Sequence, residues 1–244
     1  MTLPDAQTLY DVIDATWPAM AKTNCGPVTL RKGAGGGSRV SAATVDGPAT
    51  PQDLTAAAQA MIAMQQPALF MIRMHDDAVD RMLAEMGYVI KDPVTLYAAP
   101  IAAIAQVDLP PKTAFPVWPP LAVQQDIWAA GGIGQGRLAV MQRADCPKTT
   151  ILGRVDDHPA GTTYVGLAQG CAMIHALEIS AQHRRRGLAR QLTIAAARWG
   201  LTQGARHLTL VTTQANVGAN ALYASLGMTV VGQYHYRIKP ETAT

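Results

Sequence analysis

The sequence predicts an α/β protein in which helices flank a mixed sheet, arranged as two halves of similar design. Apolar runs of strand length alternate with helical stretches through most of the 244 residues. Residues 100–120 (PIAAIAQVDLPPKTAFPVWPP) hold six prolines and little periodicity, which places a domain boundary there. The halves also share a repeated segment, whose helix-ending glycines are Gly87 and Gly227.

The N-terminal half is predicted to open with a helix and then to alternate strands with helices. A glycine run at 33–37 separates two strand-like pieces early in this half. The predicted elements are a helix over about 5–21, strands over 27–32 and 38–45, a helix over 51–65, a strand over 68–74, a helix over 76–86 and a strand over 88–99.

The C-terminal half is predicted to begin with two helices and to continue with a larger set of strands. The predicted elements are helices over about 121–130 and 136–144, strands over 148–155, 161–168 and 171–179, a helix over 187–202, a strand over 208–213, a helix over 218–226 and a strand over 229–238. We therefore predict an N-terminal domain over 1–105, a proline-rich linker over 106–120 and a C-terminal domain over 121–244.

Composition and charge narrow the class of protein. Hydrophobic residues make up 49% of the chain and charged residues 15%, which is typical of a globular chain and not of a disordered one. The formal net charge of +3 is too small to indicate nucleic acid as the main partner. No apolar run reaches transmembrane length, so no membrane association is expected. The N-terminus lacks the basic and apolar regions of a signal peptide.

Cysteine and histidine spacing predicts neither a disulfide framework nor a metal site. The three cysteines (Cys25, Cys146 and Cys171) are far apart, which suits a reducing cytoplasm. The six histidines are scattered without ligand spacing. The glycine runs at 33–37 and 131–136 lack the Lys-Ser/Thr pair and the spacing of nucleotide loops, so we interpret them as turns.

A short basic loop joins a predicted strand to a predicted helix at residues 184–189 (RRRGLA). An apolar run, CAMIHALEI, precedes it, and the helical stretch LARQLTIAAARWGL follows. The start of a helix presents unpaired N–H groups and the positive end of the helix dipole, which together suit a phosphate group. Gly187 allows the close approach of a bulky anion. A basic loop on a solvated face would have the same composition.

A second signature follows the next strand, and together the two resemble the GCN5-related N-acetyltransferases (GNAT superfamily). Arg184, Gly187 and Ala189 fill the acyl-CoA motif Gln/Arg-x-x-Gly-x-Gly/Ala of that family. The second signature consists of Asn216, then Ala221-Leu222-Tyr223, then Gly227-Met228. The chain departs from the family pattern with Arg185 for Gly, Ala181 for Pro and Met228 for an aromatic residue. The resemblance covers about residues 113–244.

This resemblance implies an acetyl-CoA site whose parts can be named in this chain. The diphosphate of CoA is expected on main-chain N–H groups of the loop, formed by Arg184, Arg185, Arg186, Gly187, Leu188 and Ala189. The side chains of Arg185 and Arg186 either reach the 3′-phosphate or stay in water. The central strand is expected to splay from its neighbour, so that Leu177, Ile179 and Ala181 pair with the pantetheine arm. Asn216 is expected to bind that arm, to cap a helix, or both.

The resemblance also implies a general acid and leaves the general base open. Tyr223 resembles the family acid, because a phenol with a pKa near ~10 is protonated at neutral pH and can protonate a thiolate. Its alternative role is packing of the ring on the helix face. His175 and Glu178, three residues apart on one strand, are expected to point to opposite faces, so only one can reach the cleft. We favour Glu178, acting through a water, with a base-free water chain as the alternative.

The N-terminal half is predicted to be a degenerate GNAT-like domain that has lost cofactor binding. Asp76, Leu83 and Gly87 correspond to Asn216, Tyr223 and Gly227. The counterpart of the basic loop is residues 44–49 (TVDGPA), where Asp46 repels phosphate and Pro48 has no N–H to donate. The alternative is that two αβ segments merely share a helix-ending glycine.

The expected function is direct acetyl transfer from acetyl-CoA to a primary amine, without a covalent enzyme intermediate. No cysteine lies within either signature, so a ping-pong nucleophile has no candidate. The acceptor, a small molecule or a peptide, is expected in a groove between the halves. Two alternatives remain: a non-catalytic acyl-CoA-binding sensor, and a nucleic-acid module built on the three arginines. The oligomeric state is left open.

Overall fold

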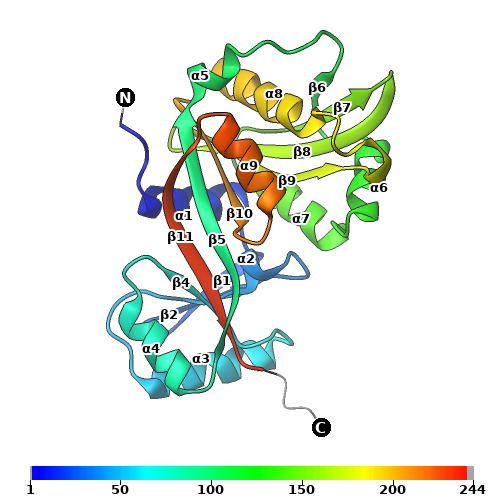
Figure 1. Cartoon of the computed structure of the whole chain (residues 1–244). Coiled ribbons are helices and arrows are strands. Elements are labelled where there is room, and N and C mark those ends of the chain that lie inside the picture. The colour runs from blue at the N-terminus through cyan, green and yellow to red at the C-terminus, as the bar shows by residue number, and fades with distance from the viewer. Residues whose placement is uncertain (1, 241–244) are drawn as a thin grey trace.

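The computed structural model describes residues 2–240, which fold around a three-stranded and an eight-stranded sheet (Figure 1). The eight strands follow the order β4-β11-β5-β10-β9-β8-β7-β6, and the three strands the order β1-β2-β3. The predicted α/β class, with helices flanking a mixed sheet, is confirmed. Both halves of the chain contribute strands to the larger sheet.

The N-terminal half follows the predicted order with three local differences, the first of which is an additional strand over 21–25. Its elements are α1 (Ala6–Thr16), β1 (Ala21–Cys25), β2 (Val28–Lys32), α2 (Ser38–Ser41), β3 (Thr44–Val45), α3 (Pro51–Ala63), β4 (Leu69–Arg73), α4 (Asp77–Glu85) and β5 (Val89–Pro100). The helix predicted to reach residue 21 ends at Thr16, because Pro18 disfavours helical geometry at Trp17. The strand predicted over 38–45 is instead the short helix α2 followed by the two-residue β3.

The C-terminal half carries more strands than the N-terminal half. Its elements are α5 (Ile101–Ala105), β6 (Ala114–Val117), α6 (Ala122–Ala130), α7 (Gln135–Arg143), β7 (Lys148–Val155), β8 (His158–Ala168), β9 (Cys171–Ile179), the 3-10 turn η1 (Ala181–His183), α8 (Leu188–Thr202), β10 (His207–Thr213), α9 (Val217–Ser225) and β11 (Thr229–Ile238). The range 106–120, predicted as a linker, contains β6, which pairs with β7 at the edge of the sheet. An edge strand tolerates Pro116, since one side of it needs no donor.

The two halves exchange their last strands. β5, which ends the N-terminal half, lies between β10 and β11, while β11 lies between β5 and β4. Both strands run side by side along the length of the molecule in Figure 1. Neither half therefore completes its part of the sheet from its own residues.

The internal repeat predicted from the sequence is present in the structure. α4 spans residues 77–85 and α9 spans residues 217–225, so the two helices have the same length and lie 140 residues apart in the sequence. Gly87 and Gly227 follow these helices with φ of 82° and 74°, a backbone geometry that favours glycine. The strand pairing repeats as well. Arg73 pairs with Tyr234, and the residues that correspond to these two in the other half, Thr213 and Val94, pair with one another.

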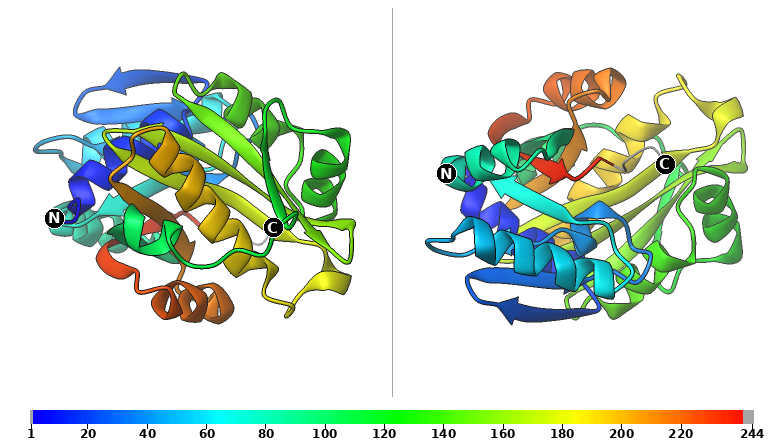
Figure 2. Two further views of the ribbon diagram at one scale, coloured as in Figure 1. Left: turned by 90° about the horizontal axis from the view of Figure 1, so that it is seen from above. Right: turned by 90° about the horizontal axis from the view of Figure 1, so that it is seen from below.

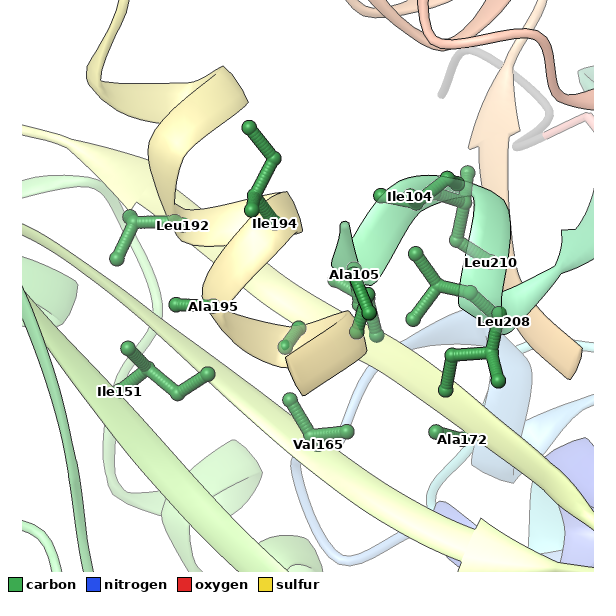
Figure 3. Packing of buried hydrophobic residues seen from close by; sticks show 14 of the residues in the cluster. Ile104, Ala105, Ile151, Val165, Ala172, Leu192, Ile194, Ala195, Leu208 and Leu210 are labelled. Carbon is green, nitrogen blue, oxygen red and sulfur yellow. The ribbon is translucent and has the colours of Figure 1, made fainter. Parts of the chain in front are cut away.

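The helix α8 is fixed against the sheet by the largest hydrophobic cluster (Figure 3). Leu192 and Ile194 of α8 are fully buried, and Ala172 and Leu208 of the sheet are buried with them. At Gly200 a Cβ would lie 2.6 Å from the Cβ of Ala172, so glycine permits the close approach of helix and strand. Figure 2 (left) shows α8 lying across the strands. Because the other face of β9 packs with α1, α8 is held on one face with its N-terminal end in a defined position.

Candidate functional site

A cleft opens where β9 and β10 separate. The two strands pair in parallel only from His207↔Cys171 to Leu210↔Ile174, although β9 continues to Ile179. Beyond this point the edges that face one another are unpaired, and a cleft of about 1020 Å³ lies there. The splayed central strand expected from the family resemblance is therefore present. The cleft is lined by residues from both halves of the chain.

A β-bulge in β9 corrects the prediction that His175 and Glu178 point to opposite faces. The register with β8 shifts between Thr162↔Glu178 and Tyr164↔His175, so β9 holds one extra residue there. The extra residue resets the alternation of side chains. Ala176 has a φ of 50° in the bulge, and its carbonyl accepts a 2.7 Å hydrogen bond from the Trp128 indole. Both His175 and Glu178 consequently line the cleft.

The basic loop ends in an uncapped helix start at the mouth of the cleft. Gly187 precedes α8 with a left-handed φ of 79°, and no side chain caps the helix. Within the part of the chain that the structure describes, the N–H groups of residues 185–190 donate to no acceptor. A Cβ on Gly187 would meet no atom within 4 Å. These main-chain donors and the open space suit a phosphate group.

The three arginines of the loop have different surroundings. Arg184 folds back onto β9, where it donates from Nε to the carbonyl of Ile179 and forms a 3.1 Å ion pair with Glu178. Arg185 lines the cleft. Arg186 instead pairs with Asp156 at 2.8 Å on an exposed face. Arg184 and Arg185 thus provide the positive charge of the loop that faces the cleft.

The cleft brings together most of the residues predicted from the sequence. The predicted residues that line it are Leu177, Glu178, Ile179, Arg184, Arg185, Gly187, Leu188, Ala189, Asn216 and Tyr223. Ala181, in η1, and Arg186 do not line it.

Tyr223 lies in α9 with its side chain in the cleft wall. The residue is 6% exposed, and its ring packs against that of Tyr97 with centroids 5.8 Å apart. Burial, and secondarily the charge that Tyr97 would carry, raises the pKa of Tyr223 to about 12. The packing foreseen as the alternative role of this tyrosine is present in the structure, and the residue also lines the cleft. The phenol is protonated at neutral pH.

The start of α9 is held by two asparagines, of which the sequence indicated one. Asn216 is the N-cap, and its Oδ1 accepts from the N–H of Ala219 at 3.1 Å. Asn220 was missed: its amide donates to the carbonyls of Thr213 and Asn216, and its Oδ1 accepts from the hydroxyl of Tyr97. Nothing in the local sequence distinguishes Asn220 from a solvated helical residue.

The far end of the cleft is built around His175 with residues from the N-terminal half. Its Nδ1 lies 2.9 Å from Arg39 Nη1 and its Nε2 lies 2.8 Å from the hydroxyl of Thr16. An arginine only donates, so Nδ1 accepts, and Nε2–H donates to Thr16, whose own proton goes to Val12. Burial, and next the charge of Arg39, lowers the pKa of His175 well below its usual range. His175 is therefore neutral, with both ring nitrogens engaged.

The glycine runs interpreted as turns also bring the halves into contact. A Cβ on Gly136 would lie 2.4 Å from the carbonyl oxygen of Gly35, so the two backbones touch. A Cβ on Gly131 would lie 2.5 Å from the Glu178 side chain, so this glycine leaves room for that carboxylate. The first contact places Gly37 and Arg39 of the N-terminal half in the cleft wall.

The corresponding gap in the N-terminal half is filled by Arg73. Its guanidinium lies between the ends of β3 and β4, donating to the carbonyl of Val45 and pairing with Asp46 at 3.0 Å and Asp76 at 3.1 Å. Asp76 occupies the place that Asn216 has in the C-terminal half. An arginine side chain thus bridges the two strands where the C-terminal half is open.

The helix start in the N-terminal half is capped by its own residues. Thr50 and Asp53 form a capping box at the start of α3, with Pro51 in the first turn. The Thr50 hydroxyl accepts from the N–H of Asp53, and Pro51 has no N–H. The Asp53 carboxylate adds negative charge at this end. At this helix start Pro51 and Asp53 therefore offer no free N–H, in contrast to the run of free donors at α8.

In residues 2–240, no group of three or more His, Cys, Asp or Glu side chains is arranged to hold a metal ion. None of the helices that the structure describes has the length and hydropathy needed to span a bilayer.

Comparison with known proteins identifies a family over the C-terminal half of the chain. The model of the acetyltransferase (GNAT) family matches residues 108–228. No curated protein matches the chain significantly. Among solved structures, a GCN5-related N-acetyltransferase from Kribbella flavida is 20% identical, has a TM-score of 0.76 and covers 97% of this chain and 96% of its own.

Two other solved structures show the same fold. A functionally unknown conserved protein from Staphylococcus epidermidis is 11% identical, with a TM-score of 0.68, and covers 95% of this chain and 98% of its own. A tandem GNAT protein from the clavulanic acid biosynthesis pathway is 14% identical, with a TM-score of 0.58, and covers 88% of this chain and 79% of its own. The chain therefore belongs to the acetyltransferase (GNAT) family through residues 108–228, and its N-terminal half is GNAT-like in fold.

Proposed function

We propose that the protein is an acyl-CoA-dependent N-acyltransferase that moves an acetyl group from acetyl-CoA directly to a primary amine. One observation carries the proposal: the cleft between β9 and β10 runs from the uncapped start of α8 to Tyr223. The first end suits a diphosphate, and the second holds a proton donor. A groove between these ends suits a long, flexible thioester.

The loop and the splayed strands would hold acetyl-CoA. The N–H groups of residues 185–190 would bind its diphosphate, because they are free and lie at the positive end of α8. The side chain of Arg185 lines the same end of the cleft and would add positive charge. Leu177 lies on the unpaired edge of β9, where the pantetheine amides would take the place of a neighbouring strand. The Ile179 carbonyl is less available, since Arg184 donates to it.

Tyr223 would act as the general acid and Glu178 as the general base. Attack of a neutral amine on the thioester carbonyl forms the amide bond, and the departing thiolate takes a proton from the Tyr223 hydroxyl. Glu178 lines the cleft with its side chain 18% exposed. It would accept the amine proton through a water. His175 is excluded as the base, because both of its ring nitrogens are engaged.

The N-terminal half would bind no second acetyl-CoA. Arg73 fills the gap between β3 and β4, and the capping box at Thr50 engages the start of α3. The acidic side chains of Asp46 and Asp53 would also repel a diphosphate. We therefore propose one acetyl-CoA per chain.

Calorimetry with acetyl-CoA, followed by a thiol-release assay with a panel of amines, tests this proposal. We expect binding with a stoichiometry of one and thiol release with at least one amine. Absence of heat with well-folded protein would refute the cofactor site.

The second candidate is an acyl-CoA-binding module without turnover. The ion pair between Glu178 and Arg184 favours it, because the candidate base is already engaged by a guanidinium. Binding of acetyl-CoA without thiol release from any amine would support this module over the transferase.

A further inference from the structure

The guanidinium of Arg39 is held in the cleft by a neutral side chain. Its Nη1 donates to His175 at 2.9 Å, and its Nε–H is buried without an acceptor. The guanidinium lies 5.9 Å from the centre of the Trp17 ring. Of the five donors of an arginine, most remain available at a site that lines the cleft.

The charges that line this cleft leave Arg39 without an anion. The two acidic side chains are Glu178, which pairs with Arg184, and Asp92, which lies 3.8 Å from Lys91. His175 is held neutral, so it positions Arg39 without adding or removing charge. Across residues 2–240, Arg39 has no ion-pair partner within 4.0 Å. An incompletely bonded guanidinium in a half-enclosed cleft favours binding of an anion.

A second arginine of the cleft lies close to the backbone that leads into α2. Arg137, near the start of α7, lines the cleft and lies over Gly37, where a Cβ would be 3.4 Å from its Nε. Gly37 precedes α2, which carries Arg39. The two guanidinium groups thus approach the cleft from different halves. Together they make this end of the cleft unfavourable for a polycationic acceptor.

We infer that the acceptor amine also carries a carboxylate, and that Arg39 binds this carboxylate. The inference rests on the transferase proposed above and names its substrate class: an amino acid or a related amino carboxylate. A planar guanidinium matches a carboxylate with two parallel hydrogen bonds. The aromatic rings of Trp17, Tyr234 and Tyr236 line the same cleft and would contact the apolar part of the acceptor.

Matched acceptor pairs test the inference. Thiol release from acetyl-CoA is measured with a series of amino acids and with the corresponding amino acid amides, which have the same shape but no carboxylate. We expect the KM of a preferred amino acid to be about 10- to 100-fold lower than that of its amide, the range for a hydrogen bond to a charged group. Polyamines are expected to be poor acceptors.

Variants of Arg39 test whether this side chain causes the preference for a carboxylate. Arg39→Gln is expected to raise the KM for the amino acid about 10- to 100-fold and to leave the KM for its amide and the affinity for acetyl-CoA unchanged. Arg39→Lys keeps the charge but loses the two parallel donors of the guanidinium, so its KM for the amino acid should lie between those of the unaltered protein and Arg39→Gln. Arg81→Gln removes the same charge from an exposed position on α4 and should change neither value. Thermal unfolding of each variant shows whether it is folded.

The possible outcomes separate the carboxylate inference from the transferase proposal on which it rests. Thiol release that is equally efficient with amides or polyamines overturns the carboxylate inference and leaves the transferase in place. An amino acid preference that persists in Arg39→Gln also overturns it, because another group would then bind the carboxylate. Binding of acetyl-CoA without thiol release from any amine overturns the transferase and this inference together.

Discussion

Replacing Tyr223 by Phe removes one hydroxyl from the wall of the cleft and nothing else. General acid catalysis by a positioned side chain contributes about 10²- to 10⁴-fold. We therefore expect the turnover number to fall by about 100-fold or more. The ring remains, and its packing on Tyr97 at 5.8 Å is kept. The affinity for acetyl-CoA should consequently change by less than about twofold, because the diphosphate site at α8 is untouched.

The pH dependence follows from the position of Tyr223 in the wall. Its protonated form is the active one, so activity would be lost as the pH rises through its pKa. Burial raises that pKa from 10.0 to about 12. At pH 10 a phenol of ordinary pKa would be about half ionised, whereas this one is about 1% ionised. Turnover should therefore rise as the acceptor amine loses its proton and then stay level to about pH 10.5.

Thiol release measured from pH 7 to about 10.5 checks both statements. Tyr97→Phe is the matched control, because it removes a neighbouring hydroxyl that bonds Asn220. Turnover that is unchanged in Tyr223→Phe would refute the acid role. A loss of activity centred near pH 10 in the unaltered protein, absent from Tyr223→Phe, would refute the argument from burial.

Three further predictions concern the cofactor site and the two halves. Gly187→Glu should abolish acetyl-CoA binding in calorimetry. Gly187→Ala has open space for its Cβ, so it should retain binding, and its left-handed φ should lower the free energy of unfolding by about 1 kcal/mol. Equal affinity of the two variants for acetyl-CoA would contradict the site. Arg73→Ala should lower the free energy of unfolding by about 1.5–3 kcal/mol in urea titrations and leave the stoichiometry at one acetyl-CoA per chain. Residues 1–105 and 106–244 should each fail to give a cooperative unfolding transition when produced alone and should give one when co-expressed, because each lacks a strand that the other supplies.

The loop end of the cleft could be predicted from the sequence because its structure is local. Residues 184–189 form a strand-to-helix loop with one glycine, and main-chain donors at a helix start depend little on the rest of the fold. Asn216 and Tyr223 could be placed for the same reason, since α9 follows β10 after a short turn. The repeat was equally visible, because α4 and α9 keep a constant spacing to their neighbours.

The acceptor end could not be predicted because it depends on contacts between distant segments. The bulge at Ala176 is stabilised by Trp128, 48 residues away, and strand periodicity alone gave the wrong face for His175. Arg39 reaches His175 across 136 residues of sequence. The order of the strands could not be predicted either, because the sequences of β5 and β11 are typical of the last strand of each half.

The strand exchange explains how a half without a cofactor site can still be needed for function. The N-terminal half supplies β5 to the sheet beside β10, and Asp92 of that strand lines the cleft. It also supplies Trp17 and Arg39 to the cleft wall. Arg73 fills the corresponding gap in this half without disturbing these contributions. Both halves are therefore required for the fold, and in the proposed transferase the half that does not hold the thioester would supply Arg39, the residue that selects the acceptor.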